Sequence, residues 1–399
     1  MISFKEALNI VLGSVSPLAP EEVIIIDSLE RVLAGDVYSD CDIPAFDYSA
    51  MDGFALKYAD TKGALPESGI KLEIVGEFRA GGDTSSKVGP GEAVKIMTGA
   101  PIPEGADAVI MVEYTKENDG SVEVFREVEE GDNIRLTGED IKNGDLVIRK
   151  GTLLNSAHVG MLASLGISRV NVVKKPRVAL LTTGDEVIGI DEEVRPGKVR
   201  NSNAYSLYCQ VKKSGGVPVN MGTARDEKGS LREGLRSCLD CDLIVTSGGV
   251  SMGEYDYVRD VINEIGMEQK FWKVAMRPGK PNLFGLIEGK PFFGLPGNPV
   301  SGMVGFEVFI GPAIRKMLGQ KGEEREVDAL LQEDIKKKKG LRFFIRAVTR
   351  WEGGRYVTVS TGPQGSGMLS SMVRANSLII LPEDEELVKQ GTMVKVRLL

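Results

Sequence analysis

Between Arg177 and Leu318 short apolar runs alternate with segments of helical periodicity, and this alternation restricts the fold more than any other feature. The apolar runs are rich in β-branched residues and end at small residues, as buried strands of a parallel sheet do. Strands that alternate with helices predict a doubly wound parallel sheet. We expect strands at Val178–Leu181, Val217–Met221, Leu243–Val245, Phe271–Val274 and Phe292–Leu295, and helices at Asn203–Lys213, Ser230–Leu239, Tyr257–Ile265 and Val300–Leu318.

Three of these strands end in loops of matched composition, rich in Gly, Thr, Ser, Pro and Asn. The loops are Thr182–Glu186, Thr246–Ser251 and Leu295–Pro299. Ligands of open α/β sheets bind at the carboxyl ends of the strands, so we expect the three loops to converge on one edge. The run Asp242–Asp256 reads as strand, glycine-rich turn and helix start, which presents N–H groups to an anion. The alternative is an ordinary turn whose glycines serve only its geometry.

Two β modules flank this region. Residues 70 to 150 contain short strand-like runs divided by Gly, Pro and Asp, and the chain turns to strands again after Gly322. Expected strands are Lys71–Val75, Ala93–Met97, Ala108–Val112 and Val122–Phe125, then Val327–Ile335, Phe343–Trp351, Arg355–Ser360, Ser377–Leu381 and Met393–Leu398. The run Lys336–Lys339 is interpreted as a solvated edge that blunts strand pairing, with a basic contact as the alternative.

Helical segments are expected before and between these modules. Ser3 and Glu6 have capping-box spacing ahead of an apolar stripe, which predicts a helix over residues 2 to 15. A second helix or an extended turn is expected at Ser28–Leu33. A further helix is predicted at Ser156–Leu165, with Gly166 as its C-cap.

Charge and residue usage exclude several functions. The net charge of -8 argues against broad nucleic-acid binding, which requires a basic face. The first residues lack the blocks of a signal peptide, and the most apolar helix, near Val300, is interrupted by Glu307 and Pro312. We therefore expect a soluble cytoplasmic protein with no membrane partner.

Cysteine and histidine content narrows the chemistry further. Cys238 and Cys241 have C-x-x-C spacing, but no second pair follows, so buried thiols are favoured over a zinc site. The one histidine, His158, lies in a predicted packed helix and is interpreted as structural. Nucleophilic catalysis by a Ser–His or Cys–His pair is excluded unless His158 serves it.

Seven motifs together resemble one known family, the MoeA-type molybdopterin molybdenumtransferases, which include the E domain of gephyrin. The resemblance spans nearly the whole chain in the order of the family. The motifs are Ser49–Ala55, Ile96–Pro101, Thr183–Glu186, Ser247–Ser251 with Gly253–Asp256, Arg277–Pro281, Leu295–Ser301, and Gly365–Met372 followed by Arg374–Asn376.

This resemblance implies a multidomain α/β plus β architecture. The implied parts are a split helical and extended domain at 1–41 and 146–175, an inserted β domain at 42–145, a doubly wound α/β molybdopterin-binding domain at 176–320, and a C-terminal β-barrel-like domain at 321–399. The family forms a homodimer whose active site lies between the α/β domain of one subunit and the β domain of the other.

The resemblance also implies a reaction. The family inserts molybdate, or tungstate, into adenylylated molybdopterin and releases AMP with the help of Mg²⁺. A molybdopterin adenylyltransferase acts upstream, and molybdenum or tungsten apoenzymes receive the product. Two other functions stay open: molybdopterin adenylylation itself, and a non-catalytic scaffold of the gephyrin type. The sequence does not distinguish molybdate from tungstate.

Site residues follow from the matching motif positions. The catalytic polar and acidic set is Asp52, Thr98, Asp140, Glu186, Asp226 and Asp256, of which Glu186, Asp226 and Asp256 are the metal candidates. The substrate-binding set is Ser247, Gly248, Gly249, Ser251, Lys273, Arg277, Lys280, Pro296, Asn298, Pro299, Ser366 and Ser371.

Two features of this assignment stay open. The family often carries lysine where Arg277 stands, and the two cations are not equivalent at an oxyanion. Arg342 and Arg346 both lie near the position of a family arginine. Four of these residues also have an ordinary alternative role: Asp226 and Asp256 as helix caps, Asp52 as a residue that holds its own loop, and Thr98 as a turn residue.

Overall fold

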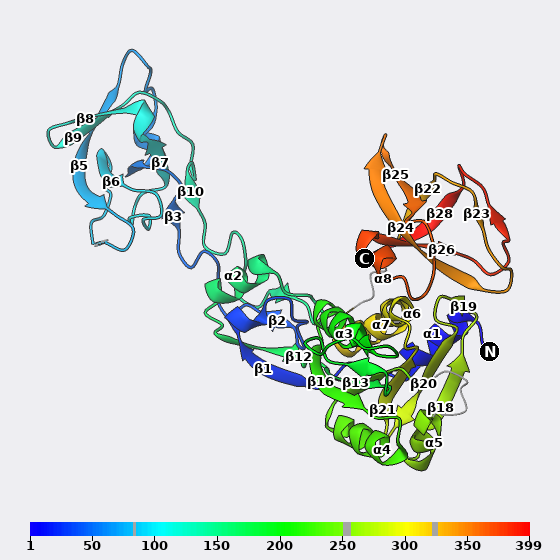
Figure 1. Cartoon of the computed structure of the whole chain (residues 1–399). Helices are drawn as coiled ribbons and strands as arrows, with labels where there is room; N and C mark the ends of the chain where they lie inside the picture. Colours follow the sequence, from blue (N-terminus) through cyan, green and yellow to red (C-terminus); the bar gives the residue numbers. More distant parts are fainter. Residues whose placement is uncertain (83–84, 250–256, 321–325) are drawn as a thin grey trace. The chain divides into compact units, whose positions relative to one another are not determined.

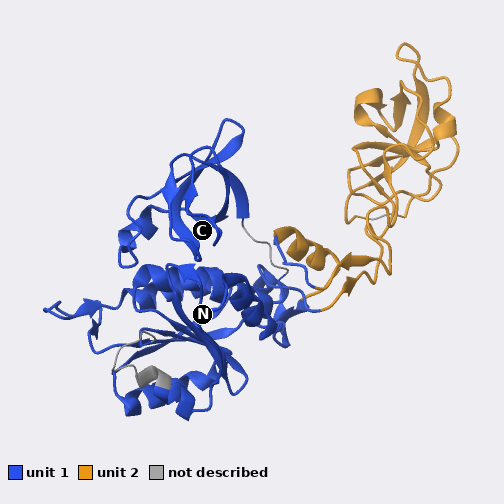
Figure 2. Cartoon of the chain, turned by 90° about the vertical axis from the view of Figure 1, so that its right-hand side faces the viewer, with its two compact units in different colours: residues 1–34, 151–155, 169–399 blue, residues 35–150, 156–168 orange. Residues whose placement is uncertain are grey.

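The computed structural model describes residues 1–82, 85–249, 257–320 and 326–399 (Figure 1). The chain divides into two compact units, which Figure 2 colours separately. Unit 1 comprises residues 1–34, 151–155 and 169–399, and unit 2 comprises residues 35–150 and 156–168. Unit 2 is thus inserted in the sequence of unit 1, and the β domain expected at 42–145 falls within it.

Unit 2 is built on a six-stranded sheet with the order β7-β4-β6-β5-β9-β8. Neighbouring strands are antiparallel except β5 and β6, which are parallel. The strands are β4 (Gly53–Leu56), β5 (Ile70–Phe78), β6 (Glu92–Ile96), β7 (Ala108–Met111), β8 (Thr115–Asn118) and β9 (Ser121–Val124). All four strands expected here are confirmed.

Both faces of strand β4 are buried. Phe54 and Leu56 pack into one core cluster and Ala55 into another, as the alternation of a strand requires. A Cβ at Gly53 would overlap the carbonyl oxygen of Ile110 on β7, so only glycine allows this close pairing. The motif Ser49–Ala55 therefore needs its glycine for packing.

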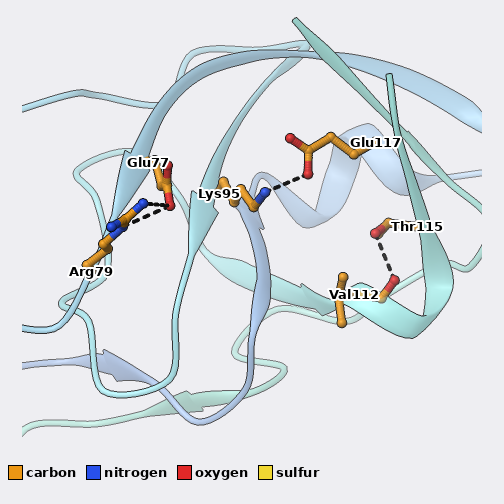
Figure 3. A network of polar contacts seen from close by, with 6 residues as sticks. All are labelled: Glu77, Arg79, Lys95, Val112, Thr115 and Glu117. Atoms are coloured by element: carbon orange, nitrogen blue, oxygen red, sulfur yellow. Dashed lines mark hydrogen bonds and ion pairs between the residues drawn. The ribbon is translucent and has the colours of Figure 1, made fainter. Parts of the chain in front are cut away.

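Surface charges of this sheet are neutralised within unit 2 (Figure 3). Lys95 Nζ on β6 lies 2.7 Å from a carboxylate oxygen of Glu117 on β8, and this hydrogen bond raises the pKa of Lys95. Arg79 pairs with Glu77 at 2.9 Å. Strands β5 and β9 lie between β6 and β8 in the sheet order, so the pair from Lys95 to Glu117 requires a strongly curled sheet.

Smaller elements complete unit 2. They are β2 (Val37–Tyr38) paired with β11 (Leu146–Ile148), β3 (Tyr48–Ser49) paired with β10 (Ile134–Arg135), the 3₁₀ turns η2 (Tyr58–Thr61) and η3 (Val112–Tyr114), and α2 (Ser156–Ser164). Helix α2 confirms the predicted helix, and Gly166 follows it with φ of 72°, as its C-cap requires. His158 lies half-buried in α2.

Unit 1 begins with α1 (Phe4–Gly13), as predicted. The Ser3 side chain accepts a hydrogen bond from the backbone N–H of Glu6, and Phe4, Ala7 and Val11 are buried. Strand β1 (Pro20–Ile24) then pairs with β12 (Arg169–Val173). The helix or turn expected at Ser28–Leu33 is instead a 3₁₀ turn, η1 (Ile25–Ser28), which ends where the prediction begins.

The α/β part of unit 1 contains a six-stranded sheet with the order β16-β13-β17-β21-β20-β18. The first four strands are parallel, and β20 is antiparallel to both of its neighbours. The strands are β13 (Arg177–Thr183), β16 (Val217–Ala224), β17 (Leu243–Ser247), β18 (Glu268–Lys273), β20 (Pro281–Ile287) and β21 (Lys290–Leu295); β14 (Val187–Ile188) and β15 (Val199–Arg200) form a separate pair. The sheet is therefore mixed, whereas the sequence predicted a parallel one.

In this sheet, β20 is the strand that the sequence analysis did not predict. It begins at Pro281, directly after the Arg277–Pro281 motif, and proline is tolerated at the first residue of a strand. Leu283, Phe284 and Ile287 are buried within it. The sequence analysis assigned no element to these residues, although their apolar side chains belong to the sheet.

Helices cover both faces of the sheet, which confirms double winding (Figure 1). Successive residues of β13 point to opposite faces of the sheet. Val178 and Leu180 pack with α1 and α3, whereas Ala179 and Leu181 pack with α4 and α5. The helices are α3 (Ser202–Lys213), α4 (Lys228–Ser237), α5 (Tyr257–Glu264) and the continuous run α6 (Pro299–Gly305), η5 (Phe306–Ile310) and α7 (Gly311–Met317), with a 3₁₀ turn η4 (Cys238–Asp240). Cys238 and Cys241 are buried, and burial raises the pKa of Cys238 to about 12.

The C-terminal part is a closed barrel. Its sheet has the order β19-β24-β25-β22-β28-β26, and an additional pairing of β24 with β26 closes the ring. The strands are β19 (Met276–Arg277), β22 (Glu326–Leu331), β24 (Arg342–Glu352), β25 (Arg355–Ser360), β26 (Ser377–Leu381) and β28 (Met393–Leu398), with α8 (Leu369–Arg374) and the pair β23 (Ile335–Lys336) and β27 (Leu387–Val388). Strand β19 comes from the α/β part, so its pairing with β24 brings Arg277 to the barrel.

Within the described residues, every helix is too short or too polar to cross a membrane.

Candidate functional site

The three strand-end loops lie together, as predicted. Strand β17 pairs in parallel with both β13 and β21, so the loops that follow these strands emerge from one sheet edge. The backbone N–H of Gly248 donates to the carbonyl oxygen of Leu295 at 3.0 Å, which joins the second loop to the third. Strand β17 lies between β13 and β21 in the sheet order, and Figure 1 labels these two flanking strands.

Close packing explains the serine-glycine turn at the end of β17. Gly248 has φ of 97°, and a Cβ there would lie 2.5 Å from the carbonyl oxygen of Thr183. Any other residue would push the turn away from the end of β13. Ser247, in front of it, is buried, whereas Ser251 lies outside the described residues. The glycine therefore serves the geometry that brings the loops together.

Two asparagines at the start of α3 hold these loops, and the sequence analysis missed both. Asn201 caps the helix by accepting from the backbone N–H of Ala204, and its Nδ2 donates to Thr182 Oγ1 at 3.0 Å. Asn203 Nδ2 donates to Ser247 Oγ at 2.7 Å and to the carbonyl oxygen of Gly297 at 2.8 Å. The signal in the sequence is the run Asn-Ser-Asn at the start of a predicted helix.

Acidic residues gather at the end of β13. The backbone N–H of Asp226 donates to Asp185 Oδ1 at 3.3 Å, and that of Asp185 to Asp226 Oδ2 at 3.4 Å. Burial raises the pKa of Asp226, and the negative charges of Asp185 and Glu186 raise it further. Asp226 is not the cap of α4, because Glu227 holds that position. The ordinary role considered for Asp226 is therefore wrong.

Two of the three metal candidates lie in the described part of the chain. Glu186 and Asp226 are close enough for their charges to interact, whereas Asp256 lies outside the described residues. Among the residues that are described, no group of three or more His, Cys, Asp or Glu side chains is arranged to hold a metal ion. The assignment of all three to one metal ion stays a prediction.

A cationic cavity of about 470 Å³ lies between β19 and the outer surface of the barrel. Ile345 and Ala347 of β24 point into the barrel core, so the alternate residues Phe344 and Arg346 point outward. Arg277 and Arg346 both line the cavity. In the described part of the chain neither guanidinium forms an ion pair with a carboxylate.

Arg346 is an unusual buried cation. Its side chain is 1% exposed, its Nε donates to Ser371 Oγ at 3.0 Å, and its Nη2 donates to the carbonyl oxygen of Gly365 at 3.0 Å. Burial lowers the pKa of Arg346 to about 10, and the nearby Arg277 contributes to this shift. A buried charge without a counter-charge is costly, so this arrangement favours an anionic ligand.

Arg342 differs from Arg346 in every respect that matters for binding. It forms an ion pair with Glu383 at 3.2 Å and lies over the ring of Phe4, 5.0 Å from its centroid. It lines a different cavity, between α1 and the barrel. Of the two arginines left open by the sequence, Arg346 is the one that faces Arg277.

The lysine run is not simply a solvated edge. Lys336, Lys337 and Lys338 line the cationic cavity, and Lys337 is only 8% exposed. Lys337 Nζ donates to the carbonyl oxygen of Leu341 at 3.1 Å and lies over the ring of Phe343. Burial lowers the pKa of Lys337. The interpretation as a solvated edge is wrong for this residue, because its side chain is buried and its backbone N–H donates to the carbonyl oxygen of Glu386 at 2.8 Å.

Acidic residues at the cavity rim are already engaged. Glu333 and Asp334 line the cavity as well, but Glu333 Oε1 accepts from the backbone N–H of Ser360 and Asp334 Oδ1 from that of Gln390. These hydrogen bonds direct one oxygen of each carboxylate to the barrel backbone. Of the charged residues that line the cavity, the buried ones are Arg346 and Lys337.

The other predicted binding residues are dispersed. Lys280 is exposed in the turn before β20, and Lys273 lines a separate cavity with Met1 and Ile2. The carbonyl oxygen of Ser366 accepts from the backbone N–H of Val300 at 3.1 Å, so its loop lies beside Pro299 and Asn298. Pro296, within the third strand-end loop, is buried.

Ser371 is fully buried, and its hydroxyl both accepts from Arg346 and donates to the carbonyl oxygen of Met368. Its geometry is that of a support for Arg346. Direct binding of substrate by Ser371 stays a prediction.

In unit 2, Asp52 and Thr98 come together across 46 residues of sequence. Asp52 Oδ1 accepts from the backbone N–H of Thr98 at 2.7 Å and from its hydroxyl at 2.8 Å, and these bonds lower the pKa of Asp52. The same arrangement joins Asp47 to Thr137, which the sequence analysis did not single out. Asp140 is exposed, and its backbone N–H donates to the carbonyl oxygen of Ile43.

Three family models match successive parts of the chain. Residues 2–166 match the MoeA N-terminal region (domain I and II), residues 179–316 match a probable molybdopterin binding domain, and residues 328–399 match the MoeA C-terminal region (domain IV). The matches cover most of the sequence in one order.

Individual relatives agree with these matches. A molybdopterin molybdenumtransferase of Bacillus subtilis is 37% identical over 385 residues, which are 95% of this chain and 90% of the relative. One of Staphylococcus aureus is 35% identical over 400 residues, or 99% and 95% of the two chains. The crystal structure of a molybdopterin biosynthesis moeA protein from Pyrococcus horikoshii OT3 superposes with a TM-score of 0.84 at 34% identity and covers all of both chains.

Proposed function

The chain belongs to the family of molybdopterin molybdenumtransferases, enzymes of molybdenum cofactor biosynthesis, and on that premise we propose that it inserts molybdate into adenylylated molybdopterin with release of AMP. Tungstate, which has nearly the same size and charge, is the alternative oxyanion. Both substrates are anions, so binding requires cations and N–H donors. The proposed chemistry needs no nucleophilic serine or cysteine, because charge neutralisation and positioning carry it.

The observation that carries the proposal is the unneutralised pair Arg277 and Arg346. The Arg346 side chain is 1% exposed, forms no ion pair within the described part of the chain and has a second guanidinium nearby, which fits a small dianion. We propose that Arg346 fills the role of the family arginine, and that Arg277 keeps the charge of the family lysine. Ser371 then orients Arg346 through its hydroxyl.

The strand-end loops fit the larger, phosphate-bearing substrate. We assign Ser247, Gly248 and Gly249 to it, together with the loop of Pro296, Asn298 and Pro299. Positive backbone angles at Gly248 and Gly249 allow the backbone to approach a ligand closely. Ser251 belongs to the same assignment by sequence alone.

The acidic group is suited to a hard cation. Mg²⁺ prefers carboxylate oxygens, and like charges beside Asp226 raise its pKa in the absence of any cation. Glu186 and Asp226, with Asp256 by sequence, would hold the ion, and Mg²⁺ when bound neutralises phosphate oxygens. Glu186 and Asp226 would otherwise repel the substrate, so their chief task is to position this positive charge.

We propose a cytoplasmic homodimer in which Asp52, Thr98 and Asp140 of one subunit complete the site of the other. Hydrogen bonds from Thr98 fix the Asp52 carboxylate and keep it ionised, which suits a group that orients a positively charged or hydroxyl-bearing ligand. A molybdopterin adenylyltransferase would supply the substrate, and molybdenum or tungsten apoenzymes would accept the product.

Release of AMP tests the function directly. The purified chain is incubated with adenylylated molybdopterin and Mg²⁺, and AMP is measured as molybdate is added. We expect molybdate-dependent AMP release, and its loss in an Asp52→Ala variant that stays folded. Adenylylation of molybdopterin by ATP without molybdate would favour the upstream adenylyltransferase instead. Absence of both reactions in a folded protein would favour a scaffold.

A further inference from the structure

Asn203 occupies a position between two loops of the proposed substrate site. It lies in the first turn of α3, and its single amide nitrogen donates to Ser247 Oγ at 2.7 Å and to the carbonyl oxygen of Gly297 at 2.8 Å. A side-chain amide has two N–H hydrogens, so one nitrogen can satisfy both acceptors at once. Asn203 thus connects the end of β17 to the loop that follows β21.

The two loops are already in contact, and Asn203 closes the contact from the side of α3. Gly248 donates to Leu295 through the backbone, and a Cβ at Gly297 would lie 3.8 Å from the Cα of Gly248. The asparagine adds the only side-chain bond between these two loops and α3 in the described residues. Its loss would leave the loops joined by backbone alone.

The direction of the hydrogen bond to Ser247 has a chemical consequence. A serine hydroxyl has one hydrogen and two lone pairs. Because the amide nitrogen of Asn203 carries only hydrogens, Ser247 Oγ must accept from it, and the Ser247 hydrogen is left to donate elsewhere. An oxyanion of the substrate is an acceptor, so this polarity prepares Ser247 to bind it.

We propose that Asn203 is a positioning residue for adenylylated molybdopterin, which holds the serine-glycine turn against the Gly297 loop and directs the Ser247 hydroxyl toward the substrate. The inference rests on the proposed function. Asn203 does not contact the substrate in this scheme and acts through Ser247. Molybdate binds in the separate cavity of Arg277 and Arg346, so its binding does not depend on Asn203.

Gln210 supplies a matched control. It lies two turns further along α3, and its Nε2 donates to the carbonyl oxygen of Met303 in α6 at 3.1 Å. The bond has the same chemistry and also anchors α3, but it touches neither loop. Gln210→Ala therefore measures the effect of loosening the helix without disturbing the loops.

The experiment compares Asn203→Ala, Asn203→Asp and Gln210→Ala in the full chain by steady-state AMP release. We expect Asn203→Ala to raise the KM for adenylylated molybdopterin about tenfold, the effect of one lost hydrogen bond of ordinary strength. The KM for molybdate should stay within about twofold, as should all constants of Gln210→Ala. Asn203→Asp should raise the KM for the pterin substrate at least as much, because the Ser247 hydroxyl then donates to the new carboxylate.

Hydrogen exchange provides a readout that does not depend on the reaction. The amides of residues 245–249 and 295–298 should exchange about fivefold faster in Asn203→Ala and at the wild-type rate in Gln210→Ala. If the wild type releases no AMP, the proposed function fails and the exchange result alone decides whether Asn203 holds the loops.

Three results would overturn the inference. The first is wild-type AMP release with an unchanged KM for the pterin substrate in Asn203→Ala. The second is a uniform change, in which the KM of both substrates, the thermal midpoint and the exchange rates shift alike in Asn203→Ala and Gln210→Ala. The third is unchanged hydrogen exchange of both loops in Asn203→Ala.

Discussion

The cationic cavity at the barrel and the acidic group at the end of β13 carry opposite charges, but each places like charges close together and buries one of them. In the cavity, burial and the neighbouring Arg277 lower the pKa of Arg346. In the acidic group, burial and the charges of Asp185 and Glu186 raise the pKa of Asp226. Each region gathers like charges and shields one of them from water. Each shift therefore works against the charged form.

Charged side chains in two other places are neutralised by ion pairs. Arg342, on the same strand as Arg346, is neutralised by Glu383, and Lys95 is neutralised by Glu117. Ion pairs of this kind are common on surfaces and contribute little to stability. The contrast teaches that the two like-charged regions are maintained at a cost in stability, which is expected where a ligand of opposite charge binds.

The largest expected effect comes from removing the buried cation. Arg346→Met should lower kcat/KM for molybdate about 100-fold, comparable to the loss of one donor at a developing anion. Arg342→Ala, the matched control on β24, should change it less than about threefold, because Glu383 already neutralises that charge. Molybdate titration of AMP release measures both. Equal losses in the two variants would show that the cavity is not the oxyanion site.

Removing one carboxylate from the acidic group should have an intermediate effect. We expect Glu186→Gln to raise the Mg²⁺ concentration for half-maximal AMP release roughly 10- to 100-fold. In EDTA the same variant should have a thermal midpoint no lower than that of the wild type, because a like charge beside Asp226 has been removed. A lower midpoint together with unchanged Mg²⁺ dependence would contradict a metal-positioning role.

The smallest expected effect is on stability against pH, and its sign should differ between Asp226 and Asp52. The raised pKa of Asp226 means that the folded state holds its proton above pH 3.8, so this group destabilises the fold as pH rises through its folded pKa. The lowered pKa of Asp52 stabilises the fold above pH 3.8, and this contribution is lost as pH falls through its folded pKa.

Thermal midpoints in magnesium-free buffer check these signs. The thermal midpoint of Asp226→Asn, taken relative to that of the wild type, should be higher at pH 7 than at pH 4. The thermal midpoint of Asp52→Asn, taken relative to that of the wild type, should be lower at pH 7 than at pH 3. The difference should be small because Asp52 is exposed. Two differences of the same sign would show that the environments of these carboxylates are not opposed.

Much of the α/β part could be predicted because its signals are local. Apolar runs between glycine-rich turns identify the parallel strands, and the positions of their ends predict the meeting of the three loops. The alternation failed at β20, where a proline-rich motif hid a strand whose apolar residues pair with β21. Strand order at a sheet edge depends on partners distant in sequence, so local periodicity could not reveal it.

The residues that hold the site in place were harder to predict from the sequence. Asn203 is an ordinary helix-start residue in the sequence, and its partners Ser247 and Gly297 lie 44 and 94 residues away. Lys337 belongs to a run of charges that is typical of a solvated edge, yet its side chain is buried. Burial of a polar side chain follows from closure of the fold around it, which composition does not record.

By itself the sequence determined the family, the alternating strands and helices, and the glycines that close approach demands, because these depend on residue type and short spacing. Only the tertiary structure decided between Arg342 and Arg346. The two stand four residues apart and face the same side of β24, so periodicity treats them alike. Their difference comes from Glu383, Ser371 and Arg277, which closure of the barrel and the pairing of β19 bring to them from distant parts of the chain.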